Sequence, residues 1–194
     1  MLSNIDISKI TVFGVESFKG CTSLGENETL DLDLDTISLG KNAFYGTKYE
    51  GITFHETTKH DLWAADGTNP HVSSMSYLQY LDYSDTKQTV AASRFYCNSL
   101  TTLVYPETVT SVHYQIGSRD TGTSIKYIIL LSNSVPTYGY NSTWAFYNGG
   151  SGCAFYVPDS MYNSYVSTWT SVPSSRIKPL SELPVGVWKT GLYQ

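Results

Sequence analysis

The chain repeats one short pattern, and this repetition constrains its fold more than any other feature. A phenylalanine followed two residues later by glycine or cysteine occurs three times, as "FKG" (18–20), "FYG" (44–46) and "FYC" (95–97). Runs spaced like L-x-x-L-x-L come a few residues after these units. Their last inward residues are predicted to recur at steps of 20 to 29 residues, at Leu34, Phe54, Tyr83, Tyr105, Leu130 and Val157. Steps of this size are typical of solenoid coils.

One coil of such a chain cannot bury its own apolar row, whereas stacked coils bury a continuous one. Alternation within each run turns Leu81 and Tyr83 inward, and likewise Leu103 and Tyr105. The phenylalanine units fill the opposite wall, where Gly20 permits the turn. The sequence therefore predicts a β-rich α/β solenoid with one parallel strand per coil.

The C-terminal part of the chain changes pattern and predicts a cap. Pro158 and Asp159 are interpreted as a helix N-cap. The helix that follows presents one apolar-aromatic face toward the last coil, made of Met161, Tyr162, Tyr165 and Trp169. We therefore divide the chain into a solenoid at 1–158, interrupted by an insertion at 55–77, and a cap with a tail at 159–194. The tail carries Trp188 and Tyr193, and fits a strand, a linker to a further domain or added residues.

Composition narrows the possible partners. The 194 residues suffice for a sizeable core, and only 15% are charged. The net charge is −5 and no basic run occurs, which argues against nucleic acid. No stretch is long and apolar enough to predict a membrane span. No signal peptide is visible at the start. If the protein works outside the cell, we expect these residues to be a mature fragment, a part of a longer chain, or a virion component released by lysis.

The search for catalytic chemistry finds no nucleophile, phosphate-loop or metalloprotease motif, so we expect no enzyme activity, no catalytic residue and no cofactor. His55, His60 and Asp61 lie close together, but their spacing matches no ligand motif, and a solvated loop is the ordinary interpretation. No metal site is predicted.

Acidic residues and cysteines also have ordinary explanations. Asp31, Asp33 and Asp35 alternate with leucine along one strand, which indicates a solvated outer row, with calcium as the alternative. The three cysteines are predicted to pack as thiols at Cys21 and Cys97, with a disulfide as the alternative, and to be more exposed at Cys153.

The repeated segments resemble a known family. The stretches "VFGVESFKGCTSL" (12–24), "ISLGKNAFYG" (37–46) and "FYCNSLTTLVYPETVTSV" (95–112) are similar to BspA-like leucine-rich repeats. The stretch at 155–184 is similar to the closing segment of gut-bacterial members. The resemblance implies a leucine-rich-repeat solenoid in a bacterial, gut-associated surface protein that contacts host or neighbouring-cell proteins or glycans.

The outward positions of the strands predict where such a ligand would bind. One expected column holds Asp31, Gly51, Tyr80, Thr102, Tyr127 and Ala154, and the other holds Asp33, Thr53, Asp82, Val104, Ile129 and Tyr156. Neighbouring strands lie about 4.8 Å apart, so the larger side chains would form one exposed patch. The candidate contact residues are Tyr80, Asp82, Val104, Tyr127, Ile129 and Tyr156. Alternatively, the insertion or another domain covers the patch, or the register is shifted by one residue.

These observations favour a non-enzymatic recognition or adhesion module at a cell surface or outside the cell. A bacteriophage tail or host-recognition protein, a structural spacer and an enzyme or metal protein built on the insertion stay as alternatives.

Overall fold

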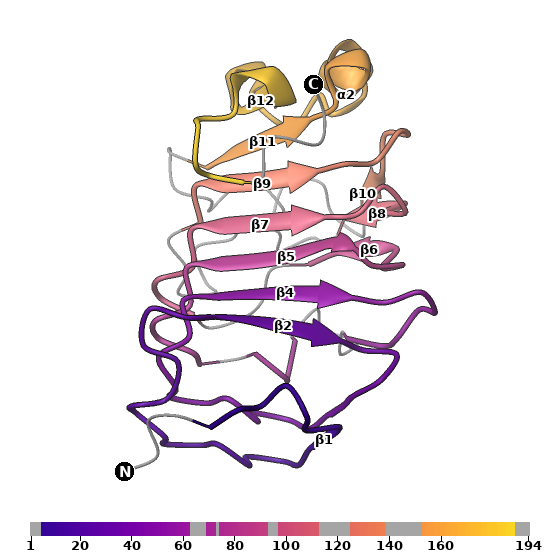
Figure 1. The fold of residues 1–194 in the computed structure, drawn as a ribbon. Coiled ribbons are helices and arrows are strands. Elements are labelled where there is room, and N and C mark those ends of the chain that lie inside the picture. The colour runs from indigo at the N-terminus through magenta and orange to yellow at the C-terminus, as the bar shows by residue number, and fades with distance from the viewer. Residues whose placement is uncertain are drawn as a thin grey trace.

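The computed structural model describes residues 5–62, 69–72, 74–92, 97–112, 125–138 and 153–188. Its main element is a parallel sheet with the strand order β12-β11-β9-β7-β5-β4-β2. Figure 1 shows these strands stacked as a ladder from the N-terminal to the C-terminal end. The strands are β2 (Thr29–Asp33), β4 (Gly51–His55), β5 (Tyr80–Asp85), β7 (Thr102–Tyr105), β9 (Tyr127–Leu130), β11 (Ala154–Val157) and β12 (Ile177–Pro179).

Short strands form further walls of the coils. They are β1 (Val12–Phe13) and β3 (Ser38–Leu39), which pair with each other, and β6 (Val90–Ala91), β8 (Ser111–Val112) and β10 (Thr137–Tyr138), which form a parallel sheet in the order β10-β8-β6. The chain makes about six turns of a parallel β-solenoid. The predicted fold class is confirmed.

The interior is built from the inward residues of the long strands, as the alternation predicted. All six predicted last inward residues, from Leu34 to Val157, are buried. Phe54, Tyr83 and Tyr105 stack across neighbouring coils, with ring centroids 4.9 and 5.8 Å apart and nearly parallel planes. Each coil thus supplies a ring to a column that no single coil could bury.

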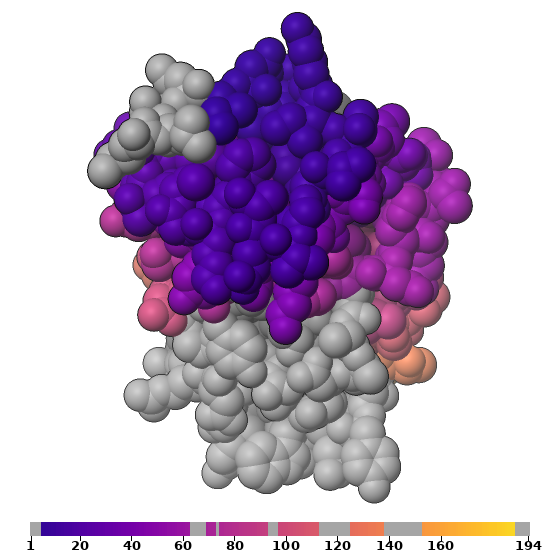
Figure 2. Space-filling view, turned by 90° about the horizontal axis from the view of Figure 1, so that it is seen from below, coloured from indigo at the N-terminus to yellow at the C-terminus, as the bar shows by residue number. Residues whose placement is uncertain are grey.

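The first two phenylalanine units lie one above the other on the return wall. The Phe18 N–H donates to the Ala43 carbonyl at 2.8 Å, and the Gly20 N–H donates to the Tyr45 carbonyl at 2.9 Å. Gly20 has φ +78°, the left-handed conformation expected at this turn. Figure 2 looks at this N-terminal end of the solenoid. Phe95, in the third unit, lies outside the described residues.

The structure corrects two local predictions. The register predicted for the first strand is shifted by two residues: Thr29, not Asp31, pairs with Gly51, and Asp31 pairs with Thr53. The reason is that the run of alternating Asp and Leu repeats every two residues and so fits either register equally well. Cys153 is buried, not exposed. All three cysteines are free thiols.

The cap consists of η2 (Asp159–Met161), α2 (Tyr162–Thr168), η3 (Ser174–Arg176), β12 and η4 (Leu180–Glu182). Tyr165 and Trp169 are fully buried, as predicted for the face over the last coil. Asp159 does not act as an N-cap; its Oδ1 accepts the backbone N–H of Ser181 at 3.0 Å. Because β12 pairs with β11, the sheet continues past residue 158, and the proposed division at that point stays a prediction.

The described part of the insertion packs onto the coils through one buried acid. Glu56 accepts hydrogen bonds from the backbone N–H groups of His60 and Lys87, at 3.0 and 2.7 Å, and from the side chain of Gln88, at 2.9 Å. These three donors balance the burial of the carboxylate. No helix in the described residues has the length and apolar character needed to cross a membrane.

Candidate functional site

The outward side chains of the middle strands line up in the two predicted columns. Tyr80 pairs with Thr102 and Thr102 with Tyr127, while Asp82, Val104, Ile129 and Tyr156 follow one another across β5, β7, β9 and β11. Tyr127 and Tyr156 come within 6.0 Å between ring centroids. The structure therefore brings all six candidate contact residues onto one face, which we call the outer face.

The outer face is not the open patch that the sequence suggested. Asp82, Val104, Ile129 and Tyr156 are at most 5% exposed, and only Tyr80 and Tyr127 are half-buried. The cover is the chain's own C-terminal tail, whose Leu183 and Trp188 join Val104, Ile129, Leu131 and Tyr156 in an apolar cluster outside the solenoid. The physical reason is that a bare aliphatic and aromatic patch is costly in water, and this segment carries matching apolar side chains.

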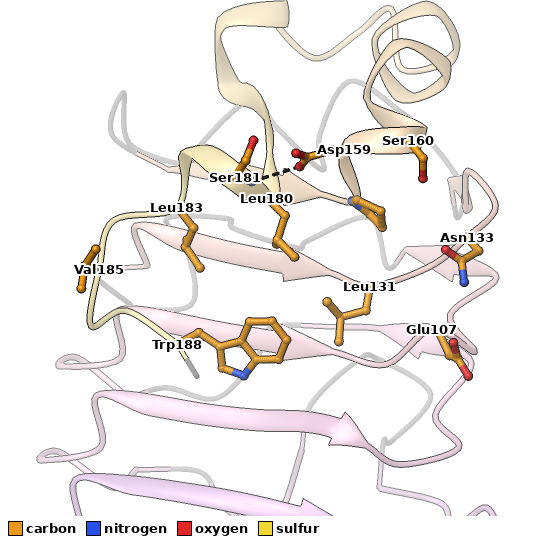
Figure 3. Close-up of a pocket in the computed structure, with 11 residues that line it drawn as sticks. Glu107, Leu131, Asn133, Asp159, Ser160, Leu180, Ser181, Leu183, Val185 and Trp188 are labelled. Atoms are coloured by element: carbon orange, nitrogen blue, oxygen red, sulfur yellow. Dashed lines mark hydrogen bonds between the residues drawn. The ribbon is translucent and has the colours of Figure 1, made fainter. Parts of the chain in front are cut away.

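Trp188 connects the tail to the sheet through a hydrogen bond and apolar packing. Its indole N–H donates to Asp82 Oδ2 at 3.1 Å, across 106 positions of sequence. The side chain is 7% exposed. Figure 3 shows the indole lying over the strands beside Leu131, with Leu183 above it and Val185 turned away. The described tail thus combines an apolar contact with a directed hydrogen bond to the sheet.

Asp82 is a carboxylate buried in largely apolar surroundings, and three donors satisfy it. Oδ1 accepts the Ser84 backbone N–H at 2.8 Å, and Oδ2 accepts the Tyr80 hydroxyl at 2.7 Å as well as the Trp188 indole. Burial, together with the charge of Asp82 and this hydrogen bond, raises the pKa of Tyr80 well above its ordinary value. Tyr80 therefore stays protonated and remains a donor to Asp82 at physiological pH.

The tail divides the outer face into two depressions. On one side lies an open groove of about 720 Å³, lined by Tyr80, Thr102 and Tyr127 and by polar residues of β2 and β4. On the other side lies a pocket of about 470 Å³ at the ends of β7, β9 and β11. Figure 3 shows this pocket, with Leu131, Leu180 and Trp188 forming its apolar wall and Glu107, Asn133 and Asp159 at its edge. Both depressions suit contact with an extended ligand.

The histidines near the insertion are engaged with aspartates. His55 bridges two neighbouring strands, because its Nε2 lies 2.6 Å from Asp31 and its Nδ1 lies 2.8 Å from Asp85. Burial lowers the pKa of His55, but the hydrogen bonds and charges of the two aspartates raise it by more, so the net shift is upward. His60 contacts Asp35 at 3.1 Å. Among the residues that the structure describes, no cluster of three or more His, Cys, Asp or Glu side chains is arranged to hold a metal ion.

Comparison with known families agrees with this geometry. The family model described as "BspA type Leucine rich repeat region" matches residues 1–64 and 68–148, in six copies. The chain belongs to this family. BspA-type leucine-rich-repeat proteins are generally associated with cell surfaces and adhesion, and their repeats typically act as non-enzymatic interaction modules. Searches of the curated proteins and of the solved structures gave no match.

The sequence analysis did not predict that the C-terminal tail covers the outer face of these BspA-type repeats. The signal was present in the apolar residues after the cap, Leu183, Val187 and Trp188, which have no place inside the coils. A second signal was Asp82, an acid in a column that is otherwise apolar from β7 onward. Such an acid requires hydrogen-bond donors from elsewhere in the chain if it is covered.

Proposed function

We propose that this chain is a non-enzymatic recognition or adhesion module that binds a protein or glycan ligand on the outer face of its main sheet. The observation that carries the proposal is the open groove beside the tail, which is bordered by Tyr80 and Tyr127. Tyrosine offers a flat apolar ring and a polar tip, which suits both protein and sugar ligands. The groove is otherwise lined by hydroxyl, amide and carboxylate groups, such as Thr102, Gln79 and Asp31.

The family also supports an extracellular setting. BspA-type repeats are typically surface-associated and leucine-rich-repeat domains generally mediate protein interactions. We propose a bacterial, gut-associated surface location, and a host or neighbouring-cell molecule as the partner. Of the six candidate contact residues, Tyr80 and Tyr127 would meet a ligand directly. Asp82, Val104, Ile129 and Tyr156 would meet it when the tail is displaced.

A protein and glycan array probed with the whole chain tests this function. Replacing Tyr80 and Tyr127 together by Ala removes the aromatic border of the groove, and we expect affinity for the captured ligand to fall at least about tenfold. Tyr45→Ala is the matched control, because Tyr45 is 39% exposed on the return wall. Tyr156 is left unchanged, because its ring is part of the buried outer cluster.

Thermal unfolding of each variant separates a binding effect from a folding effect. The proposal predicts that Tyr45→Ala binds like the wild type and that the double variant stays folded while binding weakly. Captured ligands that bind the double variant as tightly as the wild type would place the binding surface elsewhere on the solenoid.

A further inference from the structure

We propose that Asp82 and the apolar side chains around it form a docking slot for an extended, tryptophan-bearing peptide segment of a partner protein. In this structure the chain's own tail, residues 183–188, fills the slot. The inference rests on the proposed function and specifies the chemical class of the partner. The partner would be a neutral or basic peptide that places an indole against Asp82.

The sheet itself prepares the slot. Two of the three donors to Asp82, the Ser84 backbone N–H and the Tyr80 hydroxyl, belong to β5. They remain in place when the tail leaves, and they hold the carboxylate in one orientation. An incoming group therefore meets a fixed acceptor, which lowers the entropic cost of binding. Val104 and Ile129, on the next two strands, form the apolar floor.

The slot selects for an indole on chemical grounds. When a segment covers a carboxylate within an apolar cluster, it displaces water from that carboxylate. A covering segment that brings no hydrogen-bond donor therefore binds less favourably. Tryptophan supplies a large apolar ring and a single N–H, which is the combination that Trp188 presents. Phenylalanine or leucine would fill the space without replacing the hydrogen bond that the indole donates to Asp82 Oδ2.

Charge limits the partner further. The lining residues of the two depressions beside the tail include Asp31, Glu50, Glu107 and Asp159. Among the residues that the structure describes, neither set of lining residues contains lysine or arginine. Lys178, which lies next to Tyr156 across the sheet, forms an ion pair with Glu182 at 3.1 Å. An acidic peptide or an anionic glycan would therefore be repelled, whereas a neutral or basic peptide would not.

The tail is attached in a way that allows exchange. Its described backbone hydrogen bonds close its own turns, from the Leu183 N–H to the Leu180 carbonyl and from the Val187 N–H to the Pro184 carbonyl. The contacts described between tail and sheet are made by side chains. The outer cluster is also separate from the interior cluster that holds the coils together. Departure of the tail therefore exposes the slot without opening the core.

The decisive experiment uses the full chain and a synthetic peptide, PLSELPVGVW-amide, which copies residues 179–188. Labelled peptide is titrated with the Trp188→Ala protein, whose tail lacks the indole that contacts Asp82, and with the wild type. We expect saturable binding to Trp188→Ala and at least tenfold weaker apparent binding to the wild type. The tethered tail competes at an effective concentration in the millimolar range, so only the undocked fraction binds.

Matched variants test the indole and the tail separately. The peptide with Phe in place of Trp should bind Trp188→Ala at least tenfold more weakly, because it cannot donate to Asp82. Val185→Ala changes the same tail at a residue that is 95% exposed, and should leave the wild-type result unchanged. If Trp188→Ala does not fold, Trp188→Phe keeps an aromatic ring in the slot and should bind the Trp peptide more tightly than the wild type does.

Several results would overturn the assignment. These are a folded Trp188→Ala protein that binds no peptide at millimolar concentration, equal binding of the Trp and Phe peptides, and displacement of the peptide by a neutral oligosaccharide. Concentration-dependent dimers of the wild type that Trp188→Ala abolishes would make the tail of a second copy the occupant instead. Loss of peptide binding alone, with an array ligand still dependent on Tyr80 and Tyr127, would refute the slot and leave the proposed function standing.

Discussion

Three glycines at the N-terminal end provide a quantitative test of how the coils turn and stack. Gly25 has φ +82°, and a Cβ at this position would lie 2.4 Å from the ring of Tyr49. Tyr49 is 2% exposed and packs edge-on against Phe44, with ring centroids 5.9 Å apart. Gly20 has a similar φ of +78° but nothing within 4 Å, and Gly14 has neither feature. The three positions therefore separate backbone strain from side-chain collision.

The expected costs follow from these differences. Gly14→Ala should change the free energy of unfolding by less than about 1 kcal/mol. Gly20→Ala should cost about 1–2 kcal/mol, the penalty for a side chain in the left-handed region. Gly25→Ala adds about 1–3 kcal/mol of overpacking against Tyr49, for a total of about 2–5 kcal/mol.

Urea unfolding of the three variants, followed by circular dichroism, measures these differences directly. Equal costs for Gly20→Ala and Gly25→Ala would show that the contact with Tyr49 does not limit the packing of the first two coils. A Gly20→Ala variant as stable as Gly14→Ala would refute the assignment of strain to the turn itself.

Two further predictions concern titratable groups. His55→Gln should destabilise the protein at pH 5.5 by less than about 1 kcal/mol, because the site is partly exposed, as measured by urea unfolding. Because the pKa of His55 is raised in the folded protein, its contribution to the free energy of unfolding is complete below the unfolded pKa of about 6.5 and is lost as pH rises through the folded pKa. A His55→Gln variant that loses more stability at pH 8.5 than at pH 5.5 would contradict this. Burial raises the pKa of Cys97 to about 12, so iodoacetamide at pH 8 should label Cys97 at least about a hundredfold more slowly in the native than in the unfolded protein. Half-buried Cys21 serves as the internal comparison by mass spectrometry, and equal native labelling of the two would refute the burial of Cys97.

The sequence predicted the coil well because the coil is encoded locally. Alternation along each strand determined which residues face inward, and the structure confirms the buried column from Phe54 through Tyr83 to Tyr105. The same rule failed at β2, where every second residue is Leu or Asp and two registers satisfy it equally. Local periodicity defines the face of a side chain, but it does not define the neighbour across the sheet when the pattern has no irregular feature.

Exposure of the outer face could not be predicted in the same way, because it depends on a contact between residues 106 positions apart. Strand periodicity is symmetric: it shows that Val104 and Ile129 share a face with Asp82, and it contains no information about what covers that face. The segment that covers the face has to match its apolar surface and its hydrogen-bond acceptor, and that segment can come from anywhere in the chain. An apolar cluster and a carboxylate on one side require apolar surface and a donor on the other, and Leu183 and Trp188 are residues after the cap that provide both.

This balance makes a covered face compatible with the recognition that we propose. Had the tail been needed only to shield Val104 and Ile129, a leucine at position 188 would have served and Asp82 would have been a cost to stability. The Asp82–Trp188 pair instead adds a directed hydrogen bond to the contact, and two donors within β5 keep the acceptor oriented without the tail. A surface that binds one side chain more tightly than others of similar size can discriminate between partners. We therefore propose that the outer face is a selective surface with an intramolecular occupant, and not only a second hydrophobic core.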